Sequence, residues 1–360
     1  MKSVVEEFEK FIRNSGLAPF SPLTHEGYWR QLNVRTTCNN DILIIPMMHP
    51  QDMTEDQLSD VKKKIVTHFT TGPGAPLAIT SIFFKACGQK EKGVEQVLEL
   101  LWGQEYITET ILGKKFRVSP DAFLQINTAA AEVLYEKIGS LAELDSESML
   151  LDICCGTGTI GISLADRCKK VYGVELVEKA AEDAKQNAKE NGVENVAVFT
   201  GKAEDNMPHL MQHCTKANTI GVVDPPRGGL NNKVIFALRK CETMKRLVFV
   251  SCDPRNAIRN FISLGRPESK QYKGEFFIPV RAVPVDLFPH TPHFELIILF
   301  ERWEEQRWKG IMEGNPLPQD EAYFKRLSDK PTDVTEEESH KDKRAAEEQG
   351  DGPRKKMKAE

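Results

Sequence analysis

Apolar, strand-like runs alternate with helix-like segments from Asn127 to Phe300, and this alternation restricts the possible folds more than any other feature of the chain. Strands that are separated by helices usually run parallel, because the intervening helix carries the chain back across the sheet. The pattern therefore predicts an α/β fold with a doubly wound, mostly parallel sheet. The expected helices are 128–138, 161–168, 177–191, 204–214, 231–240 and 255–264.

The first 120 residues lack this regular alternation and predict a smaller α+β domain. Only one short helix precedes the first expected strand, so we expect part of a larger architecture upstream. The expected domains are residues 1–120, 121–305 and 306–360. In the first, helical spacing marks 3–12 and 54–69, and two hairpins are expected, 28–36 with 41–46 and 106–112 with 115–118.

The end of the chain is rich in charge and poor in bulky apolar residues, as in 335–344. Such a segment buries too little surface to offset its chain entropy, so we expect a disordered tail. Its basic cluster at 354–358 fits either a nuclear import signal or a solvated tail.

The eight cysteines include no Cys-x-x-Cys pair, which indicates free thiols in a reducing compartment. No apolar run is long enough to span a membrane, and the first residues do not resemble a signal peptide. The expected location is intracellular, in the cytosol, the nucleus or both.

A strand that ends in a glycine-rich turn is predicted between Leu150 and Gly161. The pattern Gly156-x-Gly158-x-x-Gly161 lets the backbone approach a ligand, and the helix start that follows exposes unpaired N–H groups. Taken alone, this pattern also fits dinucleotide binding, with Glu175 holding ribose hydroxyls. A nicotinamide-dependent enzyme is therefore one alternative.

Carboxylates at three strand ends favour a different ligand. Asp152, Glu175 and Asp224 are expected at the carboxyl ends of parallel strands, where open α/β sheets bind ligands. Together they would repel a pyrophosphate, whereas S-adenosylmethionine carries two cationic groups and offers ribose hydroxyls. Each acid alone fits a solvated strand end equally well, but their joint placement indicates S-adenosylmethionine.

Cys252 lies between an apolar strand and a helix that begins at Pro254. A cysteine there is often a small buried hydrophobe, but the helix N-terminus and Arg255 would favour the thiolate. A thiolate that adds to C6 of a pyrimidine makes C5 nucleophilic enough to accept a methyl group.

A base must then remove the C5 proton, and Glu295 at the mouth of the next buried strand can do so. Its spacing alone favours an ordinary strand-end carboxylate. His290 and His293 precede Glu295 without the helical spacing of metal ligands, so no metal is expected.

Basic residues are concentrated between Pro225 and Asn260, although the formal net charge of the chain is −5. This bias suits a phosphate backbone, but two exposed helix faces would give the same composition. The basic residues are Arg227, Lys233, Arg239, Lys240, Lys245, Arg246, Arg255 and Arg259.

Four motifs give the chain a resemblance to the RNA uracil-5 methyltransferases, which are S-adenosylmethionine-dependent enzymes with a Rossmann-like class I methyltransferase fold. The resemblance runs from about Gly27 to Arg302 and implies that 121–305 is the methyltransferase domain and that 1–120 faces RNA. The motifs are 123–127, 152–161, 224–229 with 251–254, and 289–295.

The same resemblance implies roles for particular residues. Cys252 would be the nucleophile and Glu295 the base. The residues implied to bind S-adenosylmethionine are Gln125, Cys154, Thr159, Glu175 and Asp224. Cys154 stands where the family often has an aromatic residue, which would reduce stacking area. Asp253 replaces a frequent asparagine and would raise the pKa of Cys252 through like charge.

The implied substrate is the uridine at position 54 in the T-loop of tRNA, converted to 5-methyluridine, with other structured RNA as a further possible partner. Phe123, Phe288 and Arg227 are candidates to hold the extruded base. Relatives carry an additional N-terminal RNA-binding module of OB or RRM type. We find neither in this sequence, so we expect reduced RNA affinity.

Two other functions stay open. Asp224-Pro225-Pro226 resembles the catalytic tetrapeptide of base N-methyltransferases, although Arg227 replaces the aromatic residue that stacks on their target base, and those enzymes need no cysteine. The second alternative is a tRNA-binding or folding protein whose methyltransferase fold is inactive.

Overall fold

A seven-stranded sheet organises the second half of the computed structural model, which describes residues 1–87, 98–214 and 218–302. The strand order is β12-β13-β11-β10-β7-β8-β9, and only β13 runs against its neighbours. The predicted α/β class and mostly parallel sheet are confirmed. The strands are β7 (Met149–Ile153), β8 (Lys170–Glu175), β9 (Val196–Thr200), β10 (Thr219–Val223), β11 (Met244–Ser251), β12 (Phe277–Val285) and β13 (Glu295–Arg302).

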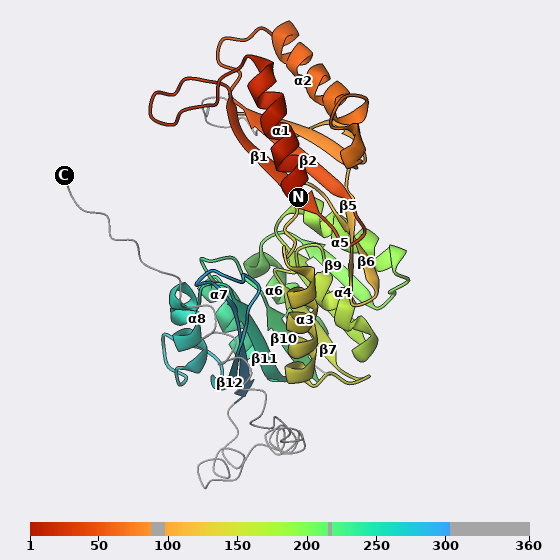
Figure 1. Cartoon of the computed structure of the whole chain (residues 1–360). Coiled ribbons are helices and arrows are strands. Elements are labelled where there is room, and N and C mark those ends of the chain that lie inside the picture. Colours follow the sequence, from red (N-terminus) through yellow and green to blue (C-terminus); the bar gives the residue numbers. More distant parts are fainter. Residues whose placement is uncertain (88–97, 215–217, 303–360) are drawn as a thin grey trace, which may run out of the picture. The chain divides into compact units, whose positions relative to one another are not determined.

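Helices cover both faces of this sheet, as Figure 1 shows. Side chains of successive strand residues point to opposite faces of the sheet. Leu150 packs on the face covered by the helices between residues 128 and 190, and Leu151 packs on the face covered by the helices between residues 203 and 265. Burial on both faces explains why the strands are continuous apolar runs. The helices are α3 (Thr128–Ala142), α4 (Thr159–Leu164) and α5 (Glu178–Glu190) on one face, and α6 (Ala203–His213), α7 (Asn232–Lys240) and α8 (Pro254–Gly265) on the other.

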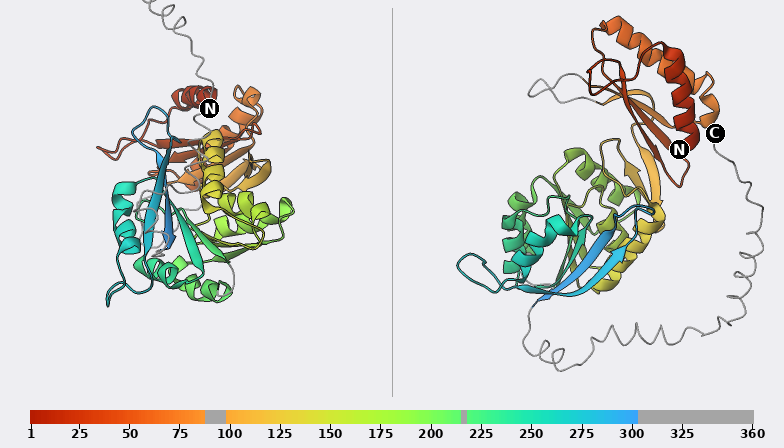
Figure 2. Two further views of the ribbon diagram at one scale, coloured as in Figure 1. Left: turned by 90° about the horizontal axis from the view of Figure 1, so that it is seen from below. Right: turned by 60° about the vertical axis from the view of Figure 1, so that its left-hand side comes forward.

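The N-terminal residues form a four-stranded sheet of order β1-β2-β3-β4 with two helices, visible in orange and red in Figure 2. Both expected helices and the first hairpin are confirmed, and Thr54 caps its helix through a capping box. The elements are α1 (Lys2–Ser15), α2 (Glu55–Thr70), β1 (Trp29–Thr36), β2 (Ile42–Met48), β3 (Ser81–Ala86) and β4 (Glu99–Gly103). Strands β3 and β4 were not predicted, because both are short and β4 is largely exposed.

The second expected hairpin, β5 (Ile107–Ile111) with β6 (Lys114–Val118), is confirmed. Leu112 and Gly113 both have positive φ, as a tight two-residue hairpin turn requires. Ile111 and Phe116 belong to the same core cluster as α3, so the hairpin packs on the large sheet domain.

The boundary expected at residue 120 follows this hairpin and stays a prediction. The expected disordered tail, with its basic cluster, lies outside the described residues. In the part of the chain that the structure describes, no helix combines the length and apolar character needed to cross a bilayer.

Candidate active site

Five of the expected site residues meet at the carboxyl edge of the parallel strands. Cys154 follows β7, Glu175 ends β8, Asp224 follows β10 and Cys252 follows β11. Glu295 reaches the same edge because β13 is reversed and begins there. The register places Val223 beside both Ile153 and Phe249, which brings Asp224 between the ends of β7 and β11.

The pairing of β11 with β13 places Cys252 opposite Glu295. Ser251, the last residue of β11, pairs with Leu296, so Cys252 just beyond the strand end is adjacent to Glu295, the first residue of β13. Cys252 is half-buried, while Glu295 is 3% exposed. The Glu295 carboxyl raises the pKa of the Cys252 thiol, which is consistent with their proximity.

The Cys252 thiol does not have the lowered pKa that its helix position suggested. Burial raises this pKa, the Glu295 and Asp224 carboxyls raise it further, and a hydrogen bond with the Arg227 side chain opposes the rise. The hydrogen-bond partner is thus Arg227 and not Arg255, although both side chains are exposed.

Asp253 has a different role from the one that we expected. Its carboxylate caps α8, with Oδ1 accepting the Asn256 N–H at 3.2 Å and Oδ2 accepting from Asn256 Nδ2 at 2.8 Å. The carboxyls that raise the pKa of Cys252 are those of Glu295 and Asp224 instead.

Two carboxyls, of which Glu295 is buried and Asp224 half-buried, give this edge high proton affinity. Burial raises the pKa of Glu295 to about 8, with a further contribution from Asp224, and raises the pKa of Asp224 itself to about 6. Glu295 Oε2 is buried and has no hydrogen-bond partner within the residues that the structure describes. An unpartnered, buried carboxyl oxygen at a strand mouth is suited to exchange a proton with a ligand.

Asp152 lies beneath the glycine turn, and its Oδ1 has no hydrogen-bond partner among the described residues, so the expectation that it is one of three ligand-facing acids stays a prediction. It is 1% exposed, and its Oδ2 accepts the Gly161 N–H at 2.8 Å. A Cβ on Gly161 would lie 2.8 Å from that oxygen, which explains the glycine. Burial raises the pKa of Asp152 to about 7.

The turn itself is held by Glu175 and by the end of β8. Cys154 has a φ of 66°, a left-handed conformation that is uncommon outside glycine. Its N–H donates to the Val174 carbonyl at 2.9 Å. Glu175 accepts the N–H of Gly156 at 2.9 Å and that of Val177 at 2.8 Å, one on each oxygen. Each oxygen retains a lone pair that can accept a hydroxyl.

The two remaining expected residues, Thr159 and Gln125, lie at the start of α4 and in the segment before α3. Thr159 Oγ1 hydrogen-bonds the Tyr135 hydroxyl at 3.0 Å. Gln125 is buried in the segment 119–127, which joins β6 to α3. Arg35 of β1 donates to the Ala122 carbonyl of this segment at 2.7 Å.

The candidates for holding a base differ in exposure. Phe123 is 68% exposed, Arg227 is also exposed, and Phe288 is half-buried against the core. Phe123 and Arg227 are thus the more accessible of the three.

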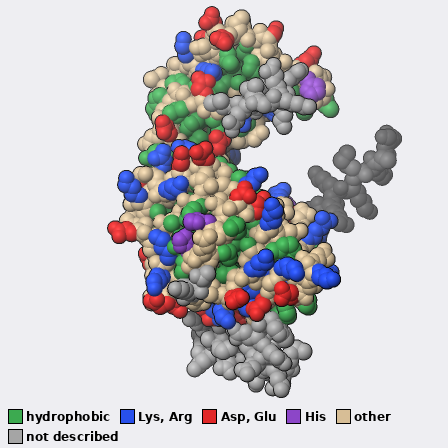
Figure 3. All heavy atoms as spheres, turned by 180° about the vertical axis from the view of Figure 1, so that it is seen from behind, with side chains coloured by type: hydrophobic (Ala, Val, Ile, Leu, Met, Phe, Trp, Pro, Cys, Tyr) green, Lys and Arg blue, Asp and Glu red, His purple; other side chains and the backbone are tan. Residues whose placement is uncertain are grey.

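The basic residues between Pro225 and Asn260 do not form one surface. Arg239 is 1% exposed and donates to backbone carbonyls, and Arg246 forms ion pairs with Glu143 and Glu301, so these two were wrongly counted as free for phosphate. Figure 3 shows Lys and Arg side chains on the side covered by α7 and α8. The exposed basic side chains lie at two edges of the sheet. Those at the carboxyl edge are Arg227, Lys233, Arg255 and Arg259, and those at the amino edge are Lys240 and Lys245.

Sequence reasoning missed Tyr135, the Arg227–Cys252 bond, and the polar face of α5. The last has a recognisable signal, since Asp183, Asn187 and Asn191 recur every four residues and two of them are fully buried.

The described residues contain no group of three or more His, Cys, Asp or Glu side chains that could hold a metal ion.

Comparison with known proteins adds a family assignment to this geometry. A sequence model described as tRNA (Uracil-5-)-methyltransferase matches residues 92–303. The chain is 46% identical over 306 residues to mouse tRNA (uracil-5-)-methyltransferase homolog A, covering 84% of this chain and 50% of that protein. It is 45% identical to mouse homolog B, covering 83% of this chain and 62% of that protein. The chain thus spans only about half to two-thirds of the length of these relatives.

A solved structure shares the fold. The tRNA (uracil-54, C5)-methyltransferase of Pyrococcus abyssi, in complex with S-adenosyl-L-homocysteine, superimposes with a TM-score of 0.61 at 23% identity. The match covers 82% of this chain and 66% of that one. The Rossmann-like class I methyltransferase fold is therefore confirmed.

Replacement of Glu295 by glutamine should stabilise the protein at high pH. The folded-state pKa of about 8 exceeds the ordinary 4.5, so wild-type stability falls as the pH rises between these values. Glu295→Gln cannot ionise and should gain on the order of 2 kcal/mol at pH 9 but nothing at pH 4. Urea unfolding at both pH values measures this, with Glu136→Gln on the exposed face of α3 as control. An equal effect of Glu295→Gln at pH 4 and pH 9 would contradict the account.

Proposed function

The chain belongs to the tRNA (uracil-5-)-methyltransferase family, and we propose that it methylates C5 of a uridine in the T-loop of tRNA, at position 54. One observation carries the proposal. Cys252 and Glu295 lie opposite each other at the edge where the glycine turn also lies. A nucleophile and a base at one edge are what C5 methylation of a pyrimidine requires.

The residues around the turn fit S-adenosylmethionine as the cofactor. Asp224 and Glu175 supply carboxylates near a turn whose backbone is free of bulky side chains, and a cationic ligand with ribose hydroxyls matches both. When bound, S-adenosylmethionine would supply the methyl group. Gln125, Cys154 and Thr159 would line its site together with the two acids.

Cys252 would act as the nucleophile. Its thiol loses a proton to solvent, and the sulfur forms a bond to C6 of uracil while the C5–C6 electron pair moves onto C5 and the enolate. Because the pKa of the thiol is raised, the Arg227 hydrogen bond is needed to favour the thiolate. Both side chains come from loops that follow parallel strands of the sheet.

Glu295 would complete the reaction as the base. Once C5 carries the methyl group, the Glu295 carboxylate takes the C5 proton, the C5–C6 double bond re-forms, and the C6–sulfur bond breaks to release Cys252. A pKa of about 8 gives Glu295 the proton affinity of an effective base near neutral pH.

The four basic residues at the carboxyl edge would bind the phosphate backbone of the RNA. Arg255 and Arg259 lie one helical turn apart on α8, which begins just after Cys252. Arg227 and Lys233 flank the start of α7 at the same edge. Their position next to the nucleophile supports an RNA that delivers its base there.

Cys252→Ala should abolish formation of 5-methyluridine, by at least about 1,000-fold, because no other group activates C5. The assay is mass spectrometry of nucleosides from a tRNA transcript incubated with methyl-deuterated S-adenosylmethionine. Cys38→Ala, at an exposed cysteine on the β1–β2 turn, should retain full activity. An N-methylated nucleoside that Cys252→Ala still forms would indicate a base N-methyltransferase, whereas 5-methyluridine from Cys252→Ala would show that Cys252 is not the nucleophile. No product from wild-type protein would indicate a tRNA-binding protein.

Charge reversal at the carboxyl edge should weaken tRNA binding. The double variant Arg255→Glu/Arg259→Glu is expected to reduce the affinity for tRNA by roughly tenfold or more. The magnitude of the slope of log K against log salt concentration should fall by about 1.5. Lys240→Glu with Lys245→Glu changes the net charge equally at the amino edge and should have a much smaller effect. The two double variants are compared by fluorescence anisotropy with labelled tRNA, at salt concentrations from 50 to 200 mM, a range of about fourfold. Equal losses would show that only net charge matters.

A further inference from the structure

The outer edge of β6 is completed by a helix instead of a strand. Three side chains of α5 and its C-cap, spaced four residues apart, bond the backbone of alternate residues after Gly113; we name Asp183, Asn187 and Asn191 the polar ladder. Four residues of helix rise about 6 Å and two residues of strand about 6.7 Å, so the two repeats match. The backbone partners are Ser119, Arg117 and Lys115, respectively.

Each rung of the polar ladder has a specific pattern of bonds. Asp183 Oδ2 accepts the Ser119 N–H at 3.0 Å. Asn187 Oδ1 accepts the Arg117 N–H at 2.7 Å, and its Nδ2 donates to the Arg117 carbonyl at 3.3 Å. Asn191 makes the same pair of bonds to Lys115, at 2.9 and 2.6 Å. The two asparagines therefore imitate a neighbouring strand.

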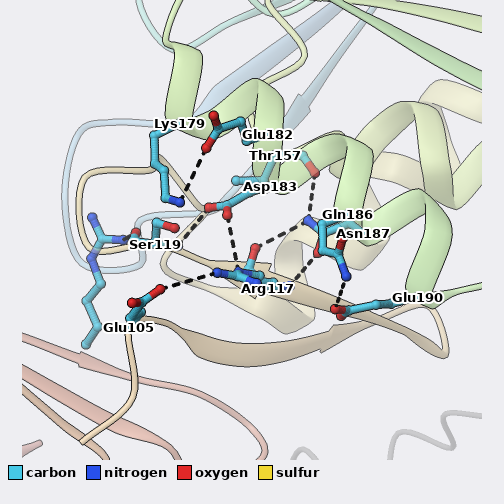
Figure 4. A network of polar contacts seen from close by, with 11 residues as sticks. Glu105, Arg117, Ser119, Thr157, Lys179, Glu182, Asp183, Gln186, Asn187 and Glu190 are labelled. Atoms are coloured by element: carbon cyan, nitrogen blue, oxygen red, sulfur yellow. Dashed lines mark hydrogen bonds and ion pairs between the residues drawn. The ribbon is translucent and has the colours of Figure 1, made fainter.

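Only Asn187 also reaches the glycine turn. Its Nδ2 donates to the Thr157 carbonyl at 3.0 Å, as Figure 4 shows, and its side chain is fully buried. Thr157 lies between Gly156 and Gly158, both with positive φ. A buried carbonyl needs a donor, so this bond restricts the path of the turn.

The other end of the ladder holds the segment that carries Gln125. That segment begins at Ser119, whose N–H is fixed by Asp183, and Asp183 also forms an ion pair with the Arg117 side chain at 3.4 Å. The Arg117 guanidinium in turn stacks on the Tyr106 ring at 3.8 Å. One buried helix face thus bonds both the strand that leads to Gln125 and the turn that carries Cys154 and Thr159.

We propose that Asn187 is a positioning residue that sets the separation between β6, which leads into the Gln125 segment, and the glycine turn, and thereby the width of the cofactor site. The inference rests on the proposed function only for the identity of the ligand, S-adenosylmethionine. Asn187 contacts neither the reacting atoms nor the carboxyl edge of the seven-stranded sheet. It acts through two backbone segments.

The decisive variant is Asn187→Asp, which keeps size and shape but replaces the donor with an oxygen facing two carbonyls. Asn191→Asp is the matched control, because it makes the same change on the rung that does not touch the turn. Hydrogen exchange of residues 154–162 in cofactor-free protein should accelerate roughly tenfold or more in Asn187→Asp and stay near wild type in Asn191→Asp.

Calorimetry with S-adenosylhomocysteine gives an independent readout. The Kd should rise roughly tenfold or more for Asn187→Asp and less than about twofold for Asn191→Asp. Equal weakening by both variants, or an unchanged turn and Kd in Asn187→Asp, would overturn the inference.

If Asn187→Asp does not fold, Asn187→Ala against Asn191→Ala makes the same comparison without added charge. Absence of binding by wild-type protein would count against the proposed function, whereas the exchange data would still decide the role of Asn187.

Discussion

The antiparallel pairing of β11 with β13 determines what this sheet can do. If β13 ran parallel to its neighbours, Glu295 would lie at the amino edge, far from Cys252. A slip of one residue would turn the Glu295 side chain to the other face. Arg302 opposes such a slip at the far end of β13, where its guanidinium donates to the carbonyls of Met244, Arg239, Glu275, Leu238 and Cys241. A buried, fully bonded arginine thus fixes the register on which the proposed chemistry depends.

Electrostatics link the cofactor to the nucleophile. Asp224 and Glu295 each raise the pKa of Cys252, and Asp224 raises that of Glu295 as well. A cation bound beside Asp224 would offset these effects and lower both pKa values. The same acids that fit a sulfonium and an ammonium group would therefore keep the thiol protonated until such a ligand is present.

The sequence predicted the parts of this structure that depend on local pattern. Periodicity located the helices and most strands, although the helix expected at 161–168 is α4 (Thr159–Leu164), and the glycine pattern with strand-end acids located the turn and Glu175. The amino-acid sequence alone could not predict properties that arise from packing between distant segments. The reversal of β13 is not encoded in its apolar run, and Arg239 looks like any surface arginine until its carbonyl partners are assembled. The raised pKa of Cys252 comes from Glu295 across the sheet, whereas local reasoning considered only the adjoining helix and Arg255. Asn187 was missed because its bonds join three separate elements.

The proposed mechanism requires that Cys252 attack uracil before the methyl group is transferred and that a C5 proton leave afterwards. A denaturing gel of the protein with S-adenosylmethionine and a tRNA transcript containing 5-fluorouridine tests it most directly, because fluorine at C5 cannot be removed as a proton. We predict a slowly migrating protein–RNA band that requires S-adenosylmethionine and is absent for Cys252→Ser. No such band from wild-type protein, under conditions where it binds both S-adenosylmethionine and the transcript, would contradict the account.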